Sequence, residues 1–350
     1  MNKDFLMDLL HTASPSGHEV EVQKKWLNYT KQFADEIRID DIGNAIAILN
    51  PDAKFKILLA GHCDEIGLVV NRIDEEGFLY FERVGGINPK AAVGMKVNVL
   101  TEEKTLPGVI GVNAQHHGGI KKDFTLADLF IDCGFKSKAE ANQYVHIGDY
   151  IVYESQPDTL MNRYLTARGL DNRTGAFIVA EVLRKLKEKN CNVGVYAAST
   201  VNEETNMSGA YFAAAGIQPN VAIATDVTFA TDYPTVDKQK HGDVRLEQGP
   251  VIAKGNILNK KIIQLLEQAA KEENIPLQYE LVNEKTHTDV DLMLYTNKGV
   301  PSAMVSLPLR YMHAPLEVVS FKDLEYEINL LVKMIANLTG EEKLSPLAEI

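Results

Sequence analysis

The chain has 350 residues, of which 45% are hydrophobic and 24% are charged, and its formal net charge is −12. This length suggests two domains, or one large domain with an insertion, and the composition allows a sizeable core. The negative charge argues against nucleic acid or an anionic membrane as a partner. No stretch approaches the ~20 apolar residues of a membrane span.

The cysteines and the N-terminus indicate a reducing compartment. Cys63, Cys133 and Cys191 are odd in number and widely spaced, which excludes a disulfide framework and a thiolate zinc site. The N-terminal residues are too polar for a signal peptide. Together these features predict a cytoplasmic protein.

The first part of the chain predicts helices, a strand and then a change of pattern. Apolar residues at helical spacing predict helices around 5–10 and 22–29. The run "KFKILLAGHCDE" predicts a buried strand that enters a polar loop. From about residue 67, short strands with turn residues follow, including a hairpin around 74–77, with one short helix near 137–144. Residues 67–160 are therefore expected to form an inserted β-rich domain.

After this insertion, strands alternate with helices. The predicted helices cover 172–189, 208–216, 259–274, 289–297 and 321–338, and the predicted strands cover 192–200, 220–225, 276–282 and 301–307. This alternation predicts an α/β three-layer sandwich with a central mixed, largely parallel sheet, formed by residues 1–66 and 161–350. In such sheets, ligands bind beyond the carboxyl ends of the strands.

Five side chains that can bind metal stand at strand ends or helix starts. They are His62 in "AGHCDE", Asp171 in "GLDNRTG", Glu204 in "VNEET", Asp226 after the apolar strand "VAIA", and His313 in "LRYMHAP". Each residue alone has an ordinary structural explanation, such as a helix cap, a loop residue or a solvated strand end. Because strand ends converge on one side of the sheet, the five residues together predict a metal centre. Two histidines and three carboxylates suit zinc first, with cobalt or manganese as alternatives.

The charges of this set favour two metal ions. Two dications carry +4 and the three carboxylates carry −3, so one hydroxide balances the remainder, and metal binding lowers the pKa of water to about 7. Glu203, beside the ligand Glu204, is then expected to be the general base. Asp64 follows His62 at a spacing that places both side chains on one face of an extended chain, where the carboxylate can orient the imidazole.

The motifs "AGHCDEIG", "GLDNRTG", "VNEET", "ATDVTFATDYP" and "LRYMHAP", in this order, resemble the tetrahedral (TET-type) dinuclear metallo-aminopeptidases, which include glutamyl and deblocking aminopeptidases. The resemblance implies that Asp171 bridges two divalent ions. It also implies that His62 and Asp226 complete one site, and that Glu204 and His313 complete the other.

The same resemblance has implications for backbone and assembly. It implies a strained, often cis, peptide bond after Asp171. The segments "VGGINPK", "DLFIDCG" and "HIGDYIV" resemble the family's barrel-like inserted domain, a dimerisation module. Family members commonly assemble as dimers into a hollow tetrahedral dodecamer, so the chain is expected to be a homo-oligomer.

Two segments depart from the family pattern. The chain reads "EKTHTDVD" where relatives carry Gly-Thr-Asp-Ala, and "EQGP" where they often have Gly-x-Gly-Pro. Both segments are expected near the substrate pocket. Lys285, Arg310 and Lys254 are candidates for a basic group that would bind an acidic substrate residue, and the sequence does not choose among them.

Three further histidines have no assigned role. His287 lies in the first of these two segments, and either lines the pocket or is a solvated loop residue. His116 and His117, in "HHGG", either reach a neighbouring subunit's active site or are solvated.

The sequence therefore predicts a metal-dependent aminopeptidase that acts on short peptides with a free N-terminus. A dinuclear amidase or deacylase acting on a non-peptide amide remains an alternative, because the same metals would serve it. A glycoside hydrolase would explain paired carboxylates but would leave His62 and His313 without a role. A non-catalytic member of the fold would leave Glu203 and the complete ligand set without a role.

Overall fold

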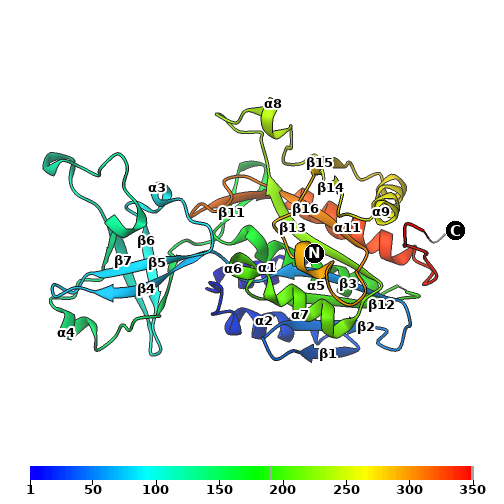
Figure 1. Cartoon of the computed structure of the whole chain (residues 1–350), viewed down its shortest axis with the longest axis horizontal. Helices are drawn as coiled ribbons and strands as arrows, with labels where there is room; N and C mark the ends of the chain where they lie inside the picture. Colours follow the sequence, from blue (N-terminus) through cyan, green and yellow to red (C-terminus); the bar gives the residue numbers. More distant parts are fainter. Residues whose placement is uncertain (190, 348–350) are drawn as a thin grey trace.

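The chain folds into a mixed α/β body with a separate barrel at one side. A computed structural model describes residues 1–189 and 191–347. In Figure 1 the barrel, drawn in cyan and green, stands apart from the body. Within residues 1–189 and 191–347, no helix is long and apolar enough to cross a membrane.

The body is built on one mixed sheet, for which the described residues supply eight strands. Their order is β1 (Glu36–Ile39), β2 (Ala45–Leu49), β12 (Gly194–Thr200), β3 (Lys56–His62), β13 (Val221–Phe229), β16 (Ser302–Leu309), β14 (Val251–Gly255) and β15 (Gln278–Val282). The four central strands β12, β3, β13 and β16 run parallel, whereas β2 and β14 join them antiparallel. The central strands are buried along most of their length, which explains their continuous apolar runs.

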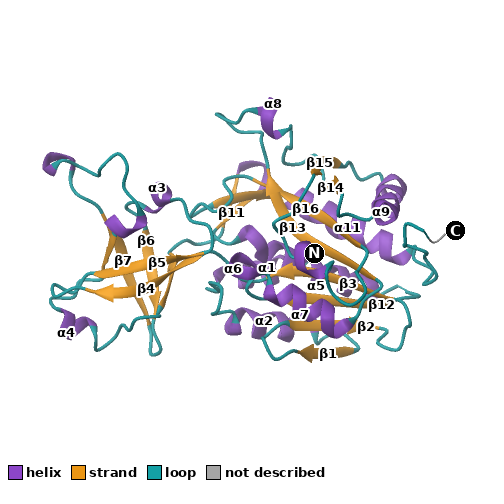
Figure 2. Cartoon of the chain, viewed as in Figure 1, coloured by secondary structure: helices purple, strands orange, loops and turns teal. Residues whose placement is uncertain are grey.

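Helices form layers on the sheet (Figure 2). One layer contains α1 (Lys3–His11), α2 (Val20–Thr30), α5 (Leu170–Lys187), α9 (Lys260–Glu273) and α11 (Phe321–Ala336), and the other contains α7 (Ser208–Ile217) and α10 (Val290–Met293). Gly61 on β3 and Gly175 on α5 allow a close approach, because a Cβ at Gly61 would collide with the backbone of Gly175. This approach brings the start of α5 to the end of β3. The observed layers confirm the predicted α/β sandwich.

The barrel is a closed antiparallel sheet with its own core. Its strands are β4 (Gly67–Ile73), β5 (Leu79–Val84), β8 (Phe130–Asp132), β7 (Thr105–Gly111), β6 (Lys96–Leu100) and β9 (Tyr150–Tyr153). Val70, Phe81, Val99 and Ile151 are among the buried side chains that fill it. The short elements α3 (Pro89–Ala92), η1 (Gln115–His117), η2 (Leu126–Asp128) and α4 (Lys138–Ala141) connect its strands. The predicted β-rich, barrel-like fold of this region is confirmed.

A small antiparallel sheet of three strands joins distant parts of the chain. It contains β10 (Asp158–Leu160), β11 (Tyr164–Ala167) and β17 (Glu317–Ser320), and the turn η3 (Met161–Arg163) links the first two strands. Because β11 precedes α5 and pairs with β17, the start of α5 lies near the segment that follows β16.

Some elements differ from the sequence prediction. The strand predicted over 220–225 continues to Phe229, because β16 continues beside it and pairs Thr228 with Pro308. Asp226 therefore lies within β13, not after it.

The helix predicted over 289–297 is reduced to α10. The sequence analysis did not identify the strands β1, β2, β14 and β17 or the helices α6 (Glu203–Asn206) and α8 (Lys238–His241).

Candidate active site

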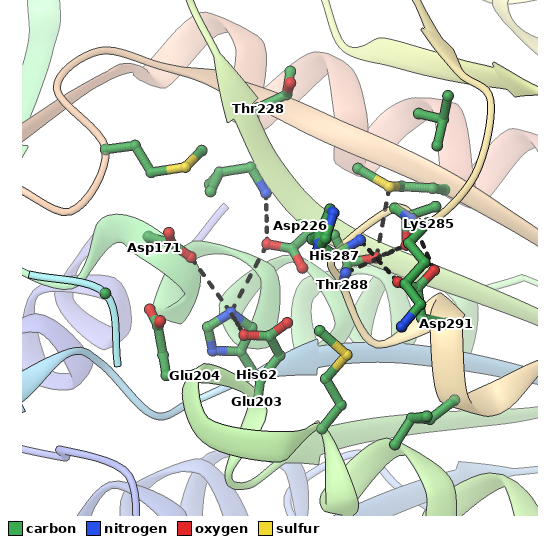
Figure 3. A pocket seen from close by; sticks show the side chains of 18 of the residues that line it. His62, Asp171, Glu203, Glu204, Asp226, Thr228, Lys285, His287, Thr288 and Asp291 are labelled. Atoms are coloured by element: carbon green, nitrogen blue, oxygen red, sulfur yellow. Dashed lines mark hydrogen bonds and ion pairs between the residues drawn. The ribbon is translucent and has the colours of Figure 1, made fainter. Parts of the chain in front are cut away.

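The side chains singled out from the sequence meet at the carboxyl edge of the central sheet. His62 ends β3, Asp226 lies near the end of β13, and Glu203 and Glu204 open α6 just after β12. Asp171 lies in the first turn of α5. Because β12, β3 and β13 are neighbouring parallel strands, residues from distant parts of the chain face one point (Figure 3).

One group of possible ligands forms around His62. Its Nε2 lies 3.4 Å from Asp171 Oδ1, 3.6 Å from Glu203 Oε2 and 3.8 Å from Asp226 Oδ1. One ligand atom from each of His62, Glu203 and Asp226 lies within 4.8 Å of the others, a spacing that can hold a metal ion. Glu203, expected to be the general base, is therefore also within ligand distance of this point.

A second group forms around His313. Its Nε2 lies 3.3 Å from Asp171 Oδ2 and 3.5 Å from Glu204 Oε2, and atoms of these three residues also lie within 4.8 Å of one another. Asp171 thus directs one carboxylate oxygen toward each histidine. The peptide bond between Asp171 and Asn172 is cis, as the resemblance implied.

Asp64 connects His62 to the pair of glutamates. Its two carboxylate oxygens accept the backbone N–H groups of Glu203 and Glu204, each at 3.1 Å. The Nδ1 atom of His62 lies 3.1 Å from the main-chain oxygen of Asp64 and 3.4 Å from its carboxylate. An N–H at Nδ1 would donate to this main-chain oxygen and leave the Nε2 lone pair for a cation.

The sequence analysis missed Glu317, which holds the second group together. This buried carboxylate accepts the backbone N–H of Asp171 through Oε2 and the backbone N–H of His313 through Oε1, both at 3.0 Å. Glu317 follows His313 by four residues in "MHAPLE", but its contact with Asp171 spans 146 residues of sequence. Only the spacing to His313 was visible in the sequence.

The electrostatics of the site fit bound cations. Burial raises the pKa values of Glu203, Glu204 and Asp226 well above their ordinary range, and neighbouring carboxylates raise them further. Although burial lowers the pKa of His62, the carboxylates around it raise that pKa well above its ordinary value. Oε1 of Glu204 is buried and has no hydrogen-bond partner among the described residues. Buried charges of one sign are normally paired or bound to metal, so two divalent cations would relieve this repulsion.

A cavity of about 670 Å³ opens above the two groups. The ligand candidates line one side, and residues of β13, β15, β16 and the segment 284–292 line the other. In Figure 3, Thr228 lies farther along the strand that carries Asp226, and the segment with Lys285, His287 and Asp291 lies beside it. This volume suits a ligand the size of a few amino-acid residues.

Only one of the three basic candidates lines this cavity. Lys285 does, whereas Lys254 bonds Glu267 at 2.7 Å and Arg310 bonds Asp232 through two bonds of 2.7 Å, both away from the lining.

The two segments that depart from the family pattern lie in different places relative to the cavity. Residues of the segment 284–291 line the cavity, His287 among them, whereas none of the residues 247–250 do. The first segment therefore lies at the pocket as expected, whereas the second segment does not line it. There the backbone N–H groups of Glu247 and Gly249 bond the buried Asp323 instead. His116 and His117 are exposed on a barrel loop and do not line the cavity.

Two adjacent groups of imidazole and carboxylate ligands beside a cavity are what a metal-dependent hydrolase requires. Residues 43–330 match the family described as M42 glutamyl aminopeptidase. The chain belongs to this family and is a metal-dependent aminopeptidase, which confirms the predicted resemblance and reaction class.

Relatives of known name or structure cover nearly the whole chain. The lysyl aminopeptidase of Pyrococcus furiosus is 32% identical over 341 residues, which cover 96% of this chain and 97% of the relative. The TET aminopeptidase from the marine sediment archaeon Thaumarchaeota archaeon SCGC AB-539-E09 has a TM-score of 0.91 at 30% identity, covering 97% of this chain and 98% of its own. The Pyrococcus horikoshii TET1 peptidase, described as able to assemble into a tetrahedron or a large octahedral shell, has a TM-score of 0.85 at 30% identity, covering 96% and 99%.

Proposed function

We propose that the chain removes the N-terminal residue from short peptides that have a free N-terminus, and that it does so with two divalent cations per subunit. The single observation that carries this proposal is the position of Asp171, whose two carboxylate oxygens lie 3.4 Å from His62 Nε2 and 3.3 Å from His313 Nε2. One carboxylate between two histidines is the arrangement of a ligand shared by two metal ions.

The ligand assignment is the one that the family resemblance implies, and the contacts of Asp171 with both histidines support it. His62, Asp226 and one oxygen of Asp171 would hold the first cation, and Glu204, His313 and the other oxygen of Asp171 would hold the second. Nitrogen and carboxylate ligands suit zinc as the default, with cobalt or manganese as alternatives. When bound, the two cations polarise the scissile carbonyl and lower the pKa of water to about 7.

Glu203 and Asp64 would have different tasks in this reaction. Glu203 is the proposed general base, which takes the proton of the attacking water and passes it to the departing amine. The proposal rests on its place beside the ligand Glu204 and its contact with the centre, 3.6 Å from His62 Nε2. Asp64 would position the centre, because it accepts the backbone N–H groups of both glutamates and contacts His62.

The barrel would serve assembly. We assign residues 1–66 and 161–350 to the catalytic domain and residues 67–160 to a dimerisation domain, with dimers that assemble into a dodecamer in the cytoplasm. The separate core of the barrel supports the domain division, and the assembly described for the Pyrococcus horikoshii relative, a tetrahedron or a large octahedral shell, supports a large homo-oligomer. Native mass spectrometry tests it, and a monomer at micromolar concentration would contradict it.

The preferred N-terminal residue needs separate evidence. The family is described as glutamyl aminopeptidase, whereas the Pyrococcus furiosus relative is named lysyl aminopeptidase. These two names refer to side chains of opposite charge, so family membership leaves the specificity of this chain open.

The test of the proposed reaction compares a free peptide with its N-acetylated copy, each before and after chelation. We expect release of the first residue from the free peptide only, loss of activity on chelation, and recovery with zinc, cobalt or manganese. Cleavage of the acetylated peptide at an equal rate would favour an amidase or deacylase. Activity that resists chelation would contradict the metal-dependent mechanism.

A further inference from the structure

One carboxylate on the cavity wall belongs to neither proposed metal site. Glu280 lies in the middle of β15, the edge strand of the main sheet, and it lines the same cavity as the ligand candidates. Its strand neighbours Tyr279 and Leu281 are 49% and 73% exposed. Because successive strand residues point to opposite faces, Glu280 is directed inward while these two neighbours face solvent.

The carboxylate of Glu280 is held in place but incompletely bonded. The Thr228 hydroxyl donates a hydrogen bond of 2.6 Å to Oε2. The other oxygen, Oε1, is buried, and neither it nor the nearby Ser306 hydroxyl has a hydrogen-bond partner of ordinary geometry in the described part of the chain. Burial raises the pKa of Glu280, and the neighbouring hydroxyl groups of Thr228 and Ser306 both act against this rise. A buried carboxylate oxygen without a partner is costly, and a bound cationic group would remove that cost.

The position of this carboxylate matches the first side chain of a substrate. Thr228 and the proposed ligand Asp226 are two residues apart on β13, so they point to the same face and lie about 7 Å apart along the strand. A peptide whose N-terminal residue is held at the metal centre would direct its first side chain into the cavity. The four-carbon stem of lysine spans a distance of this order.

The basic group in the cavity is less well placed to select a substrate. Lys285 lies on an exposed segment at the cavity rim. The cavity-lining carboxylate Asp291 already has partners, because it accepts the backbone N–H groups of Thr286 and His287 and the Thr286 hydroxyl. A charge at an exposed site is screened by water, whereas a buried charge interacts strongly with a partner of opposite sign.

We infer that Glu280, held by Thr228, selects peptides whose first residue has a basic side chain, lysine or arginine. This inference rests on the proposed aminopeptidase function and adds the substrate class. The substrate ammonium or guanidinium group would donate to the open oxygen of Glu280. A charge-assisted bond of this kind corresponds to a preference of about 10- to 100-fold over an uncharged side chain of similar length.

The test measures kcat/KM for the anilides of lysine, norleucine and glutamate with the metal-loaded enzyme. Norleucine has the apolar length of lysine without its charge. We expect the wild type to prefer lysine over norleucine by at least tenfold, and Glu280→Gln to lose this preference while its norleucine activity stays within about threefold. Norleucine cleavage also shows that the variant is folded. Thr228→Val, which removes only the hydrogen bond to Glu280, should give an intermediate preference.

Lys285→Gln is the matched control, because it removes a charge from the same cavity. It should leave the preference for lysine over norleucine unchanged. The inference is overturned if the wild type cleaves norleucine as well as lysine, or if it prefers glutamate and loses that preference in Lys285→Gln. If no free-amine substrate is cleaved with zinc, cobalt or manganese, the proposed function itself is refuted and this inference falls with it.

Discussion

Replacement of Glu317 by glutamine should weaken metal binding although Glu317 is not a proposed ligand. Its two oxygens accept the backbone N–H groups of Asp171 and His313, both at 3.0 Å, and so fix the bridging carboxylate relative to the imidazole of the second site. Glutamine keeps one acceptor oxygen but turns an NH₂ group toward the other backbone N–H. The two facing donors would push Asp171 or His313 out of place.

The expected losses of stability and of metal affinity follow from the contacts that Glu317→Gln removes. One buried hydrogen bond is lost and one buried N–H is left without an acceptor, which costs about 1–3 kcal/mol of folding stability. Loss of a group that orients metal ligands typically lowers metal affinity about 10- to 100-fold. Glu317→Gln should therefore lose metal to a chelator at correspondingly lower chelator concentration, and excess metal should restore part of its turnover.

Glu327→Gln provides a matched control with the same chemical change. Glu327 is also buried, on α11, but neither of its carboxylate oxygens has a hydrogen-bond partner in the described part of the chain. Burial, followed by the nearby charges of Asp226 and Asp323, raises its pKa well above the ordinary value. Because Glu327 interacts with Asp226 by charge but holds no ligand through a hydrogen bond, its replacement should change metal affinity less than Glu317→Gln does and should not lower the unfolding temperature. Chelator competition and thermal unfolding of both variants test the reasoning, which is wrong if Glu317→Gln retains metal as tightly as the wild type does.

Other variants test the roles of neighbouring carboxylates. Glu203→Gln should keep both metals and lose about 10²–10⁴-fold in turnover, whereas Glu204→Gln should lose metal; elemental analysis beside turnover decides, and the reverse pattern would exchange the two roles. Glu65→Gln should cost about 3–5 kcal/mol in urea unfolding, because it leaves the buried guanidinium groups of Arg168 and Arg173 unpaired. Although burial raises the pKa of Glu65, the two arginines lower it below its usual value, so its stabilisation should be present above about pH 4.3 and disappear at lower pH in the wild type only.

The positions of His62, Asp171, Glu204 and Asp226 could be predicted from the sequence because each has a local signal. A strand end or a helix start can be recognised from the pattern of apolar residues, and the geometry of parallel sheets brings such points together. The same reasoning failed for the end of β13, because the strand continues through polar residues that pair with β16. The apolar pattern alone could not show that pairing.

Glu317 and Glu280 could not be assigned from the sequence for a different reason. Their tasks depend on contacts with Asp171 and Thr228, which are 146 and 52 residues away. A carboxylate in a short segment near a strand has the same local pattern whether it is solvated or buried. Only the packing of the sheet distinguishes these two cases.

The proposed metal ligands and the proposed substrate-selecting residue come from different parts of the sheet. His62, Glu204 and Asp226 come from or follow the central strands β3, β12 and β13, which are buried and fixed by neighbours on both sides. Glu280 comes from the edge strand β15, which has a neighbouring strand on one side in the sheet. A substitution at this edge changes the cavity wall without moving a central strand. Substrate preference can therefore vary while the metal centre is preserved, which is why Glu280→Gln is expected to change the choice of substrate and to spare the reaction itself.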